Sequence, residues 1–147
     1  LENVLYDVES DIVKLIDFGF SGLIVNINQS YLNSEIEKVH GTPLYLAPEV
    51  VKKEIMSGFD LIKADIWSLG VMLYRLIYRL CPYQPNTREK LVSIMKSNKL
   101  KINYPENELI SSNYLKILES CLQLDPLKRG NIETLKEILK NFDILAL

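Results

Sequence analysis

The chain has 147 residues, 48% of them hydrophobic, so it can bury one sizeable core and hardly two. Its 17 basic and 19 acidic residues are mixed along the length and give a formal net charge of −2. This balance lacks the basic footprint of a protein that binds nucleic acid or an anionic membrane surface, so we expect neither partner. The two cysteines, Cys81 and Cys121, lack the spacing of a C-x-x-C metal or redox site and are too few for a disulfide framework.

No stretch approaches the roughly 18 consecutive apolar residues of a membrane span, and no signal-peptide pattern opens the chain. We therefore expect a soluble, cytoplasmic protein without a membrane span. The first residue is a leucine, and the segment that follows it reads as the middle of a larger unit. The sequence is therefore expected to be cut from a longer polypeptide.

Two short apolar runs, Val4–Tyr6 and Ile12–Ile16, flank a polar stretch and predict a small β-hairpin. Residues 20–46 sustain neither a helical nor a strand period, and a loop of that length in a compact domain is usually functional or disordered. A helix buried on most of its surface is predicted at Lys63–Leu80. Three helices of ordinary length are predicted after it, at Asn86–Lys96, Ser112–Leu122 and Asn131–Asn141. The expected fold class is mainly α, with a hairpin at the start.

The triplet Asp17-Phe18-Gly19 closes the second apolar run. An Asp followed closely by a Gly commonly stops a strand and starts a turn, so the triplet alone favours a turn over chemistry. Three other short motifs accompany it: Asn3 ends "LEN", "APE" closes the long loop at Ala47–Glu49, and "ADIWSLG" opens the buried helix. Each motif is weak alone, and the information lies in their order and intervals.

Together these motifs resemble the large lobe of a eukaryotic protein kinase, whose signature set includes the catalytic-loop Asn, D-F-G and A-P-E. The resemblance covers essentially all 147 residues and is most specific in "GTPLYLAPEVV" and "KADIWSLGVMLY". It implies that residues 1–147 are the C-terminal lobe of a protein kinase domain: the catalytic-loop end, DFG, the activation segment, APE and the following helices. The small ATP-binding lobe would be absent from this sequence.

The resemblance implies a magnesium and nucleotide site near the start of the chain. Asp17 would bind a Mg²⁺ ion that bridges to the phosphates of ATP, and Asn3 would hold the second metal ion; carboxylate and amide oxygens suit Mg²⁺. Leu5 would form the floor under the adenine ring. Phe18 would pack into the core beneath the site, and Gly19 would give the backbone the freedom to swing Asp17 in or out.

Four further residues carry over from the family pattern. Thr42 stands where Ser/Thr-specific kinases keep a hydroxyl that contacts the catalytic Asp, so protein substrates with Ser or Thr acceptors are implied. Asp65 would lie at the start of the buried helix and hydrogen-bond the backbone of the catalytic loop, since a buried acid demands partners. Glu49 and Arg129 would form the family's buried ion pair, and an exposed salt bridge is the alternative.

The family's catalytic Asp stands five residues before the Asn of H-R-D-x-x-x-x-N, so counting back from Asn3 places it before Leu1. The chain alone is therefore expected to be inactive. The parent protein would be either an active Ser/Thr kinase or a pseudokinase, that is, a scaffold or regulatory interaction module. Intact Asn3, Asp17 and Gly19 favour the active kinase, because a scaffold has no need for metal ligands.

Regulation and subfamily can also be inferred from the resemblance. Lys38 occupies the activation-loop position that many relatives phosphorylate, so we expect the loop to be ordered either constitutively or by modification at Ser30, Tyr31 or Ser34, with Ser34 the first choice. Among Ser/Thr kinases, the motifs look most like the autophagy-initiating group and, next, the calcium/calmodulin-dependent type.

Overall fold

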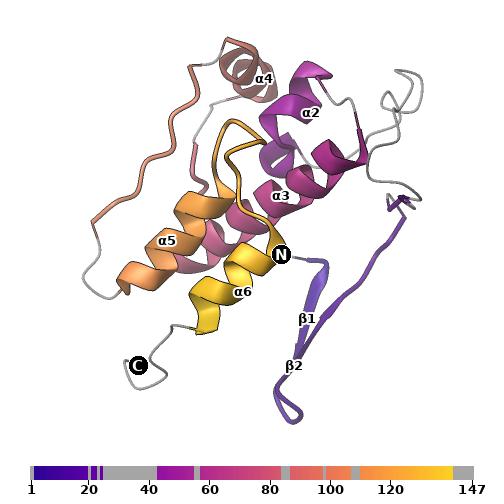
Figure 1. Cartoon of the computed structure of the whole chain (residues 1–147), viewed down its shortest axis with the longest axis vertical. Helices are drawn as coiled ribbons and strands as arrows, with labels where there is room; N and C mark the ends of the chain where they lie inside the picture. Colours follow the sequence, from indigo (N-terminus) through magenta and orange to yellow (C-terminus); the bar gives the residue numbers. More distant parts are fainter. Residues whose placement is uncertain are drawn as a thin grey trace.

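The computed structural model describes residues 2–19, 21–22, 24, 43–54, 57–83, 87–97, 99–106 and 110–140. Over these ranges it is mainly helical, and a hairpin precedes the helices as expected (Figure 1). The elements are β1 Val4–Asp7, β2 Ile12–Leu15, the 3-10 helix η1 Pro43–Tyr45, α2 Pro48–Lys52, α3 Gly58–Tyr78, α4 Arg88–Lys96, α5 Ser112–Cys121 and α6 Ile132–Lys140. The prediction of a mainly α fold with an initial hairpin is confirmed.

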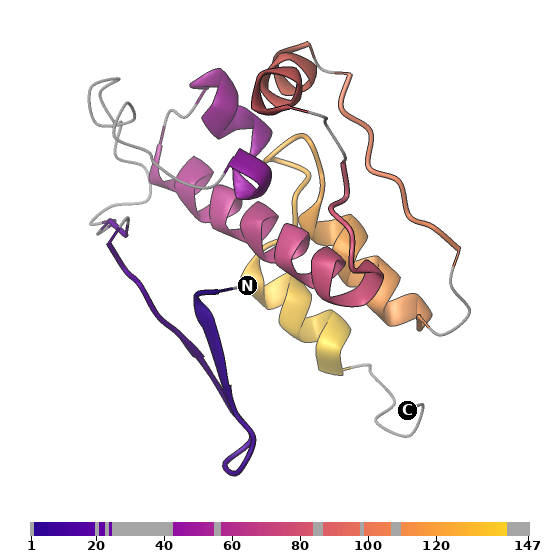
Figure 2. The ribbon, with the colours of Figure 1, turned by 180° about the vertical axis from the view of Figure 1, so that it is seen from behind.

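The hairpin is a two-stranded antiparallel sheet in which Val4 lies opposite Leu15. Its turn is closed by Asp7, whose Oδ1 accepts from the Glu9 amide at 3.1 Å and whose Oδ2 accepts from Ser10 Oγ at 2.6 Å. Figures 1 and 2 show the hairpin projecting away from the helices. Large apolar side chains on both strands are exposed: Leu5, Tyr6, Ile12, Val13 and Leu15. Because an isolated two-stranded hairpin is at best marginally stable, this part of the fold has little support of its own.

Helix α3 runs through the centre of the helical body and begins earlier than the sequence analysis predicted. It starts at Gly58, whereas periodicity indicated Lys63. The Asp60 carboxylate accepts from the Ser57 amide at 2.9 Å and from Ser57 Oγ at 3.1 Å, which closes the first turn with a capping arrangement. The other predicted helix ends differ from the structure by only one or two residues, as is usual for frayed termini.

Two short helices, η1 and α2, were not predicted. Pro48 stands in the first turn of α2, where its missing N–H costs nothing, and Glu49 places negative charge at the same end. The helix stops at Lys53, which takes a left-handed conformation with φ of 62°. Both elements are too short for a periodic signal, so the residues around the A-P-E motif read as loop in the sequence.

The core lies around α3, with α5 and then α6 on one side and α2 and α4 on the other (Figures 1 and 2). Its fully or nearly fully buried side chains come from four helices and include Trp67, Val71, Tyr74, Leu91, Met95, Ile117, Leu118, Cys121 and Leu135. Tyr74 Oη donates to the Asn103 carbonyl at 2.6 Å and so fastens the segment after α4 to α3. Among the helices of the described ranges, none has the length and apolarity to cross a membrane.

Gly70 allows α3 and α5 to approach each other closely. A Cβ atom at this position would lie 2.5 Å from Cβ of Cys121 and 2.9 Å from Cδ2 of Leu122. We expect Gly70→Ala to lower the free energy of unfolding by about 1–2 kcal/mol, because overpacking outweighs the better helix propensity of alanine. Urea denaturation measures the change, and Gly22→Ala is the control, since no atom of another described residue, its chain neighbours aside, lies within 4 Å of the added Cβ. Equal stability of Gly70→Ala and the wild type would contradict the close approach.

Burial of Cys121 also makes the free energy of unfolding depend on pH in the alkaline range. Burial raises the pKa of the Cys121 thiol to about 12, while the nearby Arg129 charge acts in the opposite direction. An unperturbed thiol titrates near 9.0, so between these two values the unfolded chain binds fewer protons than the folded one. The thiol therefore stabilises the fold fully below about pH 9, and its contribution decreases as the pH rises, by about 1.4 kcal/mol per pH unit.

The Cys121→Ala variant isolates this contribution. We expect its free energy of unfolding to fall less steeply with pH than that of the wild type above about pH 9, in urea titrations at a series of pH values. Comparing slopes rather than absolute stabilities removes the cost of the cavity that alanine leaves. Cys81→Ala, which removes the other, less buried thiol, is measured alongside for comparison. Identical slopes for Cys121→Ala and wild type would show that the thiol does not resist ionisation.

Candidate active site

The hairpin positions two of the predicted metal ligands, Asn3 and Asp17. Asn3 directly precedes β1, and Asp17 follows β2 after one intervening residue. The Ile16 amide donates to the Asn3 carbonyl at 3.0 Å, which continues the antiparallel register one pair beyond the ladder. Asn3 therefore lies beside the residue that precedes Asp17, and both candidate ligands are exposed at the open end of the hairpin.

Asp17 has an unusual backbone conformation. Its φ is 61°, in the left-handed region that residues other than glycine rarely adopt, and its Oδ1 accepts from the Gly19 amide at 3.2 Å. Asp enters this region more readily than most residues because its short side chain bonds to the local backbone. This conformation ends the extended backbone of the strand at Asp17. The unusual backbone angle of the site therefore belongs to Asp17, whereas Gly19 has no positive φ.

The chemistry of these two residues fits Mg²⁺. Asp17 offers a carboxylate and Asn3 an amide oxygen, and hard oxygen donors are what this ion takes. In the ranges that the structure describes, no group of three or more His, Cys, Asp or Glu side chains could hold a metal ion. One carboxylate and one amide suit an ion that completes its coordination with water and substrate phosphates.

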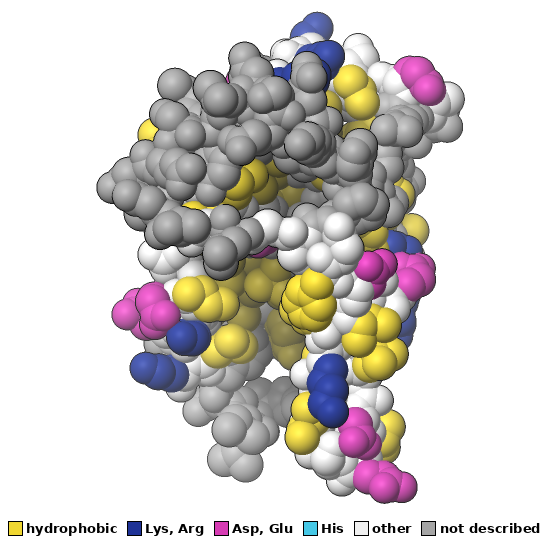
Figure 3. All heavy atoms as spheres, turned by 90° about the vertical axis from the view of Figure 1, so that its right-hand side faces the viewer, with side chains coloured by type: hydrophobic (Ala, Val, Ile, Leu, Met, Phe, Trp, Pro, Cys, Tyr) yellow, Lys and Arg dark blue, Asp and Glu magenta, His cyan; other side chains and the backbone are white. Residues whose placement is uncertain are grey.

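The expectation that Phe18 packs into the core beneath the site is wrong in this structure. The Phe18 residue is 67% exposed, because the hairpin projects from the helical body instead of lying against it. Leu5, the predicted floor of the adenine site, is 51% exposed for the same reason. Figure 3 shows hydrophobic side chains gathered in a hollow on the face of the molecule that it presents. The described residues thus leave the apolar side chains of the hairpin largely uncovered.

The expectation for Asp65 is also wrong in this structure. It was expected to be a buried acid at the start of the helix, but the capping at Ser57 and Asp60 starts α3 earlier and places Asp65 well inside it. The residue is exposed, and no hydrogen bond joins its carboxylate to another described residue. Atoms packed around the carboxyl still desolvate it enough to raise its pKa above the usual value.

Glu49 and Arg129 lie together in a buried, bidentate ion pair. Arg129 Nη1 donates to Glu49 Oε1 at 2.6 Å, and Nη2 donates to Oε2 at 3.0 Å. Both residues are almost completely excluded from solvent. The two parallel bonds fit the planar guanidinium to the carboxylate and join the A-P-E segment to the loop between α5 and α6.

Arg129 makes three further contacts that involve backbone or ring atoms. Its Nη1 also donates to the Lys63 carbonyl at 2.7 Å, and its Nε donates to the Gln123 carbonyl at 3.0 Å. The guanidinium carbon lies 5.1 Å from the centre of the Trp67 ring, within range of a cation–π interaction. One side chain thereby connects α2, α3 and the loop between α5 and α6.

Lys63 is a buried cation that sequence reasoning missed. Its Nζ donates to the Arg129 carbonyl and, at 3.1 Å, to the Gly130 carbonyl, and it lies 5.2 Å from the centre of the Phe59 ring. Desolvation lowers the pKa of Lys63, and the Arg129 charge lowers it further. Lysine is seldom buried without such partners. The position of Lys63 at the start of "KADIWSLG" did not indicate that these carbonyls would lie beside it.

The segment before A-P-E is tied to α3 by residues that the sequence analysis did not single out. Ser68 Oγ donates to the Tyr45 carbonyl at 2.8 Å, and Tyr83 Oη donates to the Leu44 carbonyl. Arg75 donates to Tyr45 Oη, and its guanidinium carbon lies 5.5 Å from the centre of that ring. These bonds fix η1 against the helical body.

Two other predicted residues, Thr42 and Ser34, lie outside the described residues.

A comparison with known families identifies the chain. The protein kinase domain family matches residues 1–140, so the chain belongs to the protein kinase family. It is 35% identical over 152 residues to serine/threonine-protein kinase STE20 of Debaryomyces hansenii, a match that covers 99% of this chain and 13% of that protein.

Relatives with other names match at similar levels. CBL-interacting serine/threonine-protein kinase 5 of Arabidopsis thaliana is 35% identical over 144 residues, covering 96% of this chain and 30% of that protein. Serine/threonine-protein kinase ATG1 of Colletotrichum lindemuthianum is 29% identical over 121 residues, covering 82% of this chain and 16% of that protein. The chain thus spans less than a third of the length of each of these relatives, and the similar identities favour no one subfamily.

The buried pair predicts a large effect of Arg129→Leu on stability. The substitution leaves the Glu49 carboxylate buried without its counter-ion, and we expect the free energy of unfolding to fall by about 3–5 kcal/mol in urea denaturation. Lys136→Leu is the matched control, because Lys136 pairs with Glu133 at 3.0 Å on the exposed surface of α6 and should change stability by less than about 1 kcal/mol. Similar decreases in the free energy of unfolding for the two variants would contradict the distinction between a buried and an exposed ion pair.

Proposed function

We propose that this chain is the C-terminal lobe of a serine/threonine kinase that transfers the γ-phosphate of ATP to Ser or Thr side chains of protein substrates. The observation that carries the proposal is the placement of Asn3 and Asp17 at the open end of the hairpin, in a chain of the protein kinase family. The names of its relatives as serine/threonine-protein kinases support the choice of acceptor. A cytoplasmic location stays a prediction.

Each residue of the proposed site has a definite task. Asp17 and Asn3 hold Mg²⁺ through oxygen atoms, and the bound ions would neutralise charge on the phosphoryl group during transfer. Leu5 presents an apolar surface on which the adenine ring can lie, and the hydroxyl of Thr42 would contact the catalytic Asp of the full-length protein. The left-handed backbone at Asp17 sets the direction of its carboxylate, and Gly19, two residues further on, lets that direction change.

Activity belongs to the full-length protein in this proposal. The family's catalytic Asp and the small lobe that closes over ATP are parts that residues 1–147 do not supply, so the chain alone is proposed to be inactive. The metal ligands distinguish the proposal from a pseudokinase scaffold, since an amide and a carboxylate at the same hairpin end serve transfer and contribute nothing to the buried core.

Asp17→Asn in the full-length protein tests the proposal. The change removes the negative charge while it keeps the size of the side chain and its tolerance of the left-handed conformation. We expect kcat for phosphorylation of a generic Ser/Thr peptide to fall by about a hundredfold or more, because a charge that stabilises the transition state is lost. Radiolabel transfer from ATP measures the rate.

Asp11→Asn is the matched control. Asp11 is also an exposed aspartate of the hairpin and also has a positive φ, 53°, but it lies in the turn at the opposite end. Its replacement should leave the rate unchanged. Unaltered transfer by Asp17→Asn would overturn the metal-ligand assignment, and the absence of transfer by the wild-type full-length protein would favour the pseudokinase.

A further inference from the structure

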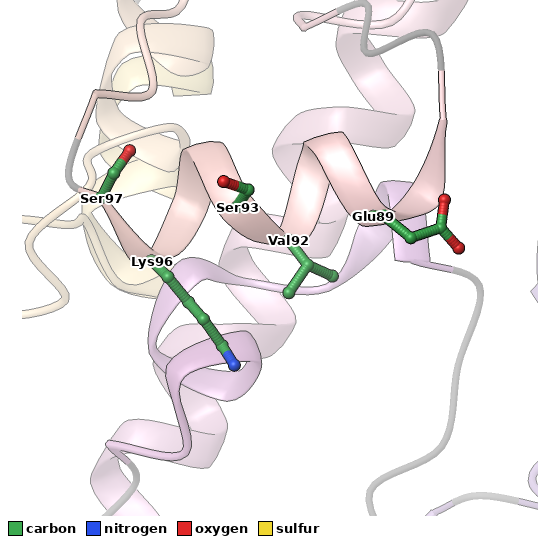
Figure 4. A pocket seen from close by; sticks show the side chains of 5 residues that line it. All are labelled: Glu89, Val92, Ser93, Lys96 and Ser97. Atoms are coloured by element: carbon green, nitrogen blue, oxygen red, sulfur yellow. The ribbon is translucent and has the colours of Figure 1, made fainter.

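Two hollows on the helical body differ in what they could bind. The larger, of about 640 Å³, lies along α4 and is lined by Glu89, Val92, Ser93, Lys96 and Ser97. Figure 4 shows Glu89, Val92, Ser93 and Lys96 on this helix and Ser97 just after its end, with Val92 and Lys96 extended to one side. Val92 is the one apolar side chain among them, so this surface gives no basis for choosing a ligand.

The second hollow, which we call the α2–α4 cleft, has a volume of about 390 Å³ and is formed by three separate segments. They are α2 with the residues after it, the end of α4 with Leu100, and the loop between α5 and α6. No described residue of the hairpin lines it. A ligand in the cleft would therefore touch neither Asn3 nor Asp17.

The floor of the α2–α4 cleft is apolar, and its rim exposes apolar side chains. Met95 and Leu100 are buried beneath it, with prolines at either side. On the rim, Leu124 is 40% exposed, and Leu127, just beyond the lining residues, is 77% exposed. A concave, mainly apolar surface with a few polar groups is typical of a binding site, and large exposed leucines beside it extend the area that a partner could cover.

The charges of the cleft favour a cationic partner. Its lining holds three carboxylates, of Glu49, Glu54 and Asp125, and the ammonium group of Lys52. Glu49 is neutralised by Arg129, and Glu54 lies 3.6 Å from Lys52. Asp125 is exposed and forms no ion pair with another described residue; its Oδ1 accepts from the Leu127 amide at 2.9 Å. Among the residues that line the cleft, Asp125 is therefore the one carboxylate without an ion-pair partner; beyond the lining, Lys128 is exposed three residues further on.

We propose that the α2–α4 cleft docks a segment of a partner protein that inserts leucine-sized side chains and places a lysine or arginine next to Asp125. The apolar floor accepts the first feature, and the unpaired carboxylate on the rim accepts the second. An acidic segment or a nucleic acid is disfavoured by the same charge. The inference is independent of phosphoryl transfer, because none of the cleft residues belongs to the proposed metal site.

Fluorescence anisotropy with the full-length protein tests the docking surface. The probe is a short fluorescein-labelled peptide with two adjacent leucines and an arginine on either side, compared with the same peptide carrying glutamates in place of the arginines. We expect saturable binding of the arginine probe. Leu124→Gln should weaken it by about tenfold, and Asp125→Asn, which can still accept from the Leu127 amide, by about threefold. Leu139→Gln is the control and should have no effect; it changes a leucine of α6 that is 52% exposed, somewhat more than Leu124.

Four results of the binding assay would overturn the proposal. They are the absence of saturable binding of the arginine probe, equal binding of the glutamate probe, equal weakening by Leu139→Gln, and an unchanged affinity of Asp125→Asn. Self-association of the protein that Leu124→Gln abolishes would also overturn it, because the occupant would then be a second copy of the chain. Transfer to a generic peptide is measured in parallel, and its presence or absence bears on the kinase proposal alone.

Discussion

The helical body depends on the buried guanidinium of Arg129. Four of its five N–H groups donate to oxygen atoms: two to the Glu49 carboxylate, one to the Lys63 carbonyl and one to the Gln123 carbonyl. Burying such a charge is costly, so the ion pair contributes little net stability compared with an apolar replacement of the whole set. What it does contribute is a fixed arrangement, because every acceptor must be in place for the charge to be tolerated.

That arrangement fixes the segment around the A-P-E motif. Glu49 ties the start of α2 to the loop between α5 and α6, and Ser68, Tyr83 and Arg75 hold η1 just ahead of it. The candidate metal ligands lie on a different part of the molecule, on a hairpin that adds nothing to the buried core. The structure therefore combines a packed body with a loosely supported hairpin that carries the proposed metal ligands, and segments that bind and release ligands are commonly the less stable parts of a protein.

The sequence predicted the elements that have a period and missed those that depend on local or distant partners. The length and apolar pattern of residues 63–80 were sufficient for α3, but its true start rests on the Ser57 and Asp60 cap, which lies outside the periodic stretch. The position of Asp65 was misjudged for that reason. The prediction for Phe18 failed because a pattern of residue types says nothing about which part of a fold will cover a side chain.

The residues of the candidate site also differ in how far the sequence predicted them. The family resemblance named Asn3 and Asp17 together, and the hairpin predicted from the two apolar runs is the element that brings them to one end. Glu49 and Arg129 are 80 positions apart, and only the family resemblance suggested that they meet. Lys63 gave no signal at all, since its partners are backbone carbonyls at Arg129 and Gly130, whose positions follow from the packing of α3 against the loop between α5 and α6.

Amide hydrogen exchange, followed residue by residue in the whole chain, tests most directly whether the helical body and the hairpin are separate in stability. We expect the amides of α3 and α5 to exchange only through global unfolding and those of β1 and β2 to exchange faster by several orders of magnitude, because the strands are largely exposed and project away from the helices. Equal protection of the hairpin and α3 would contradict this separation and would show that the two parts unfold as one unit.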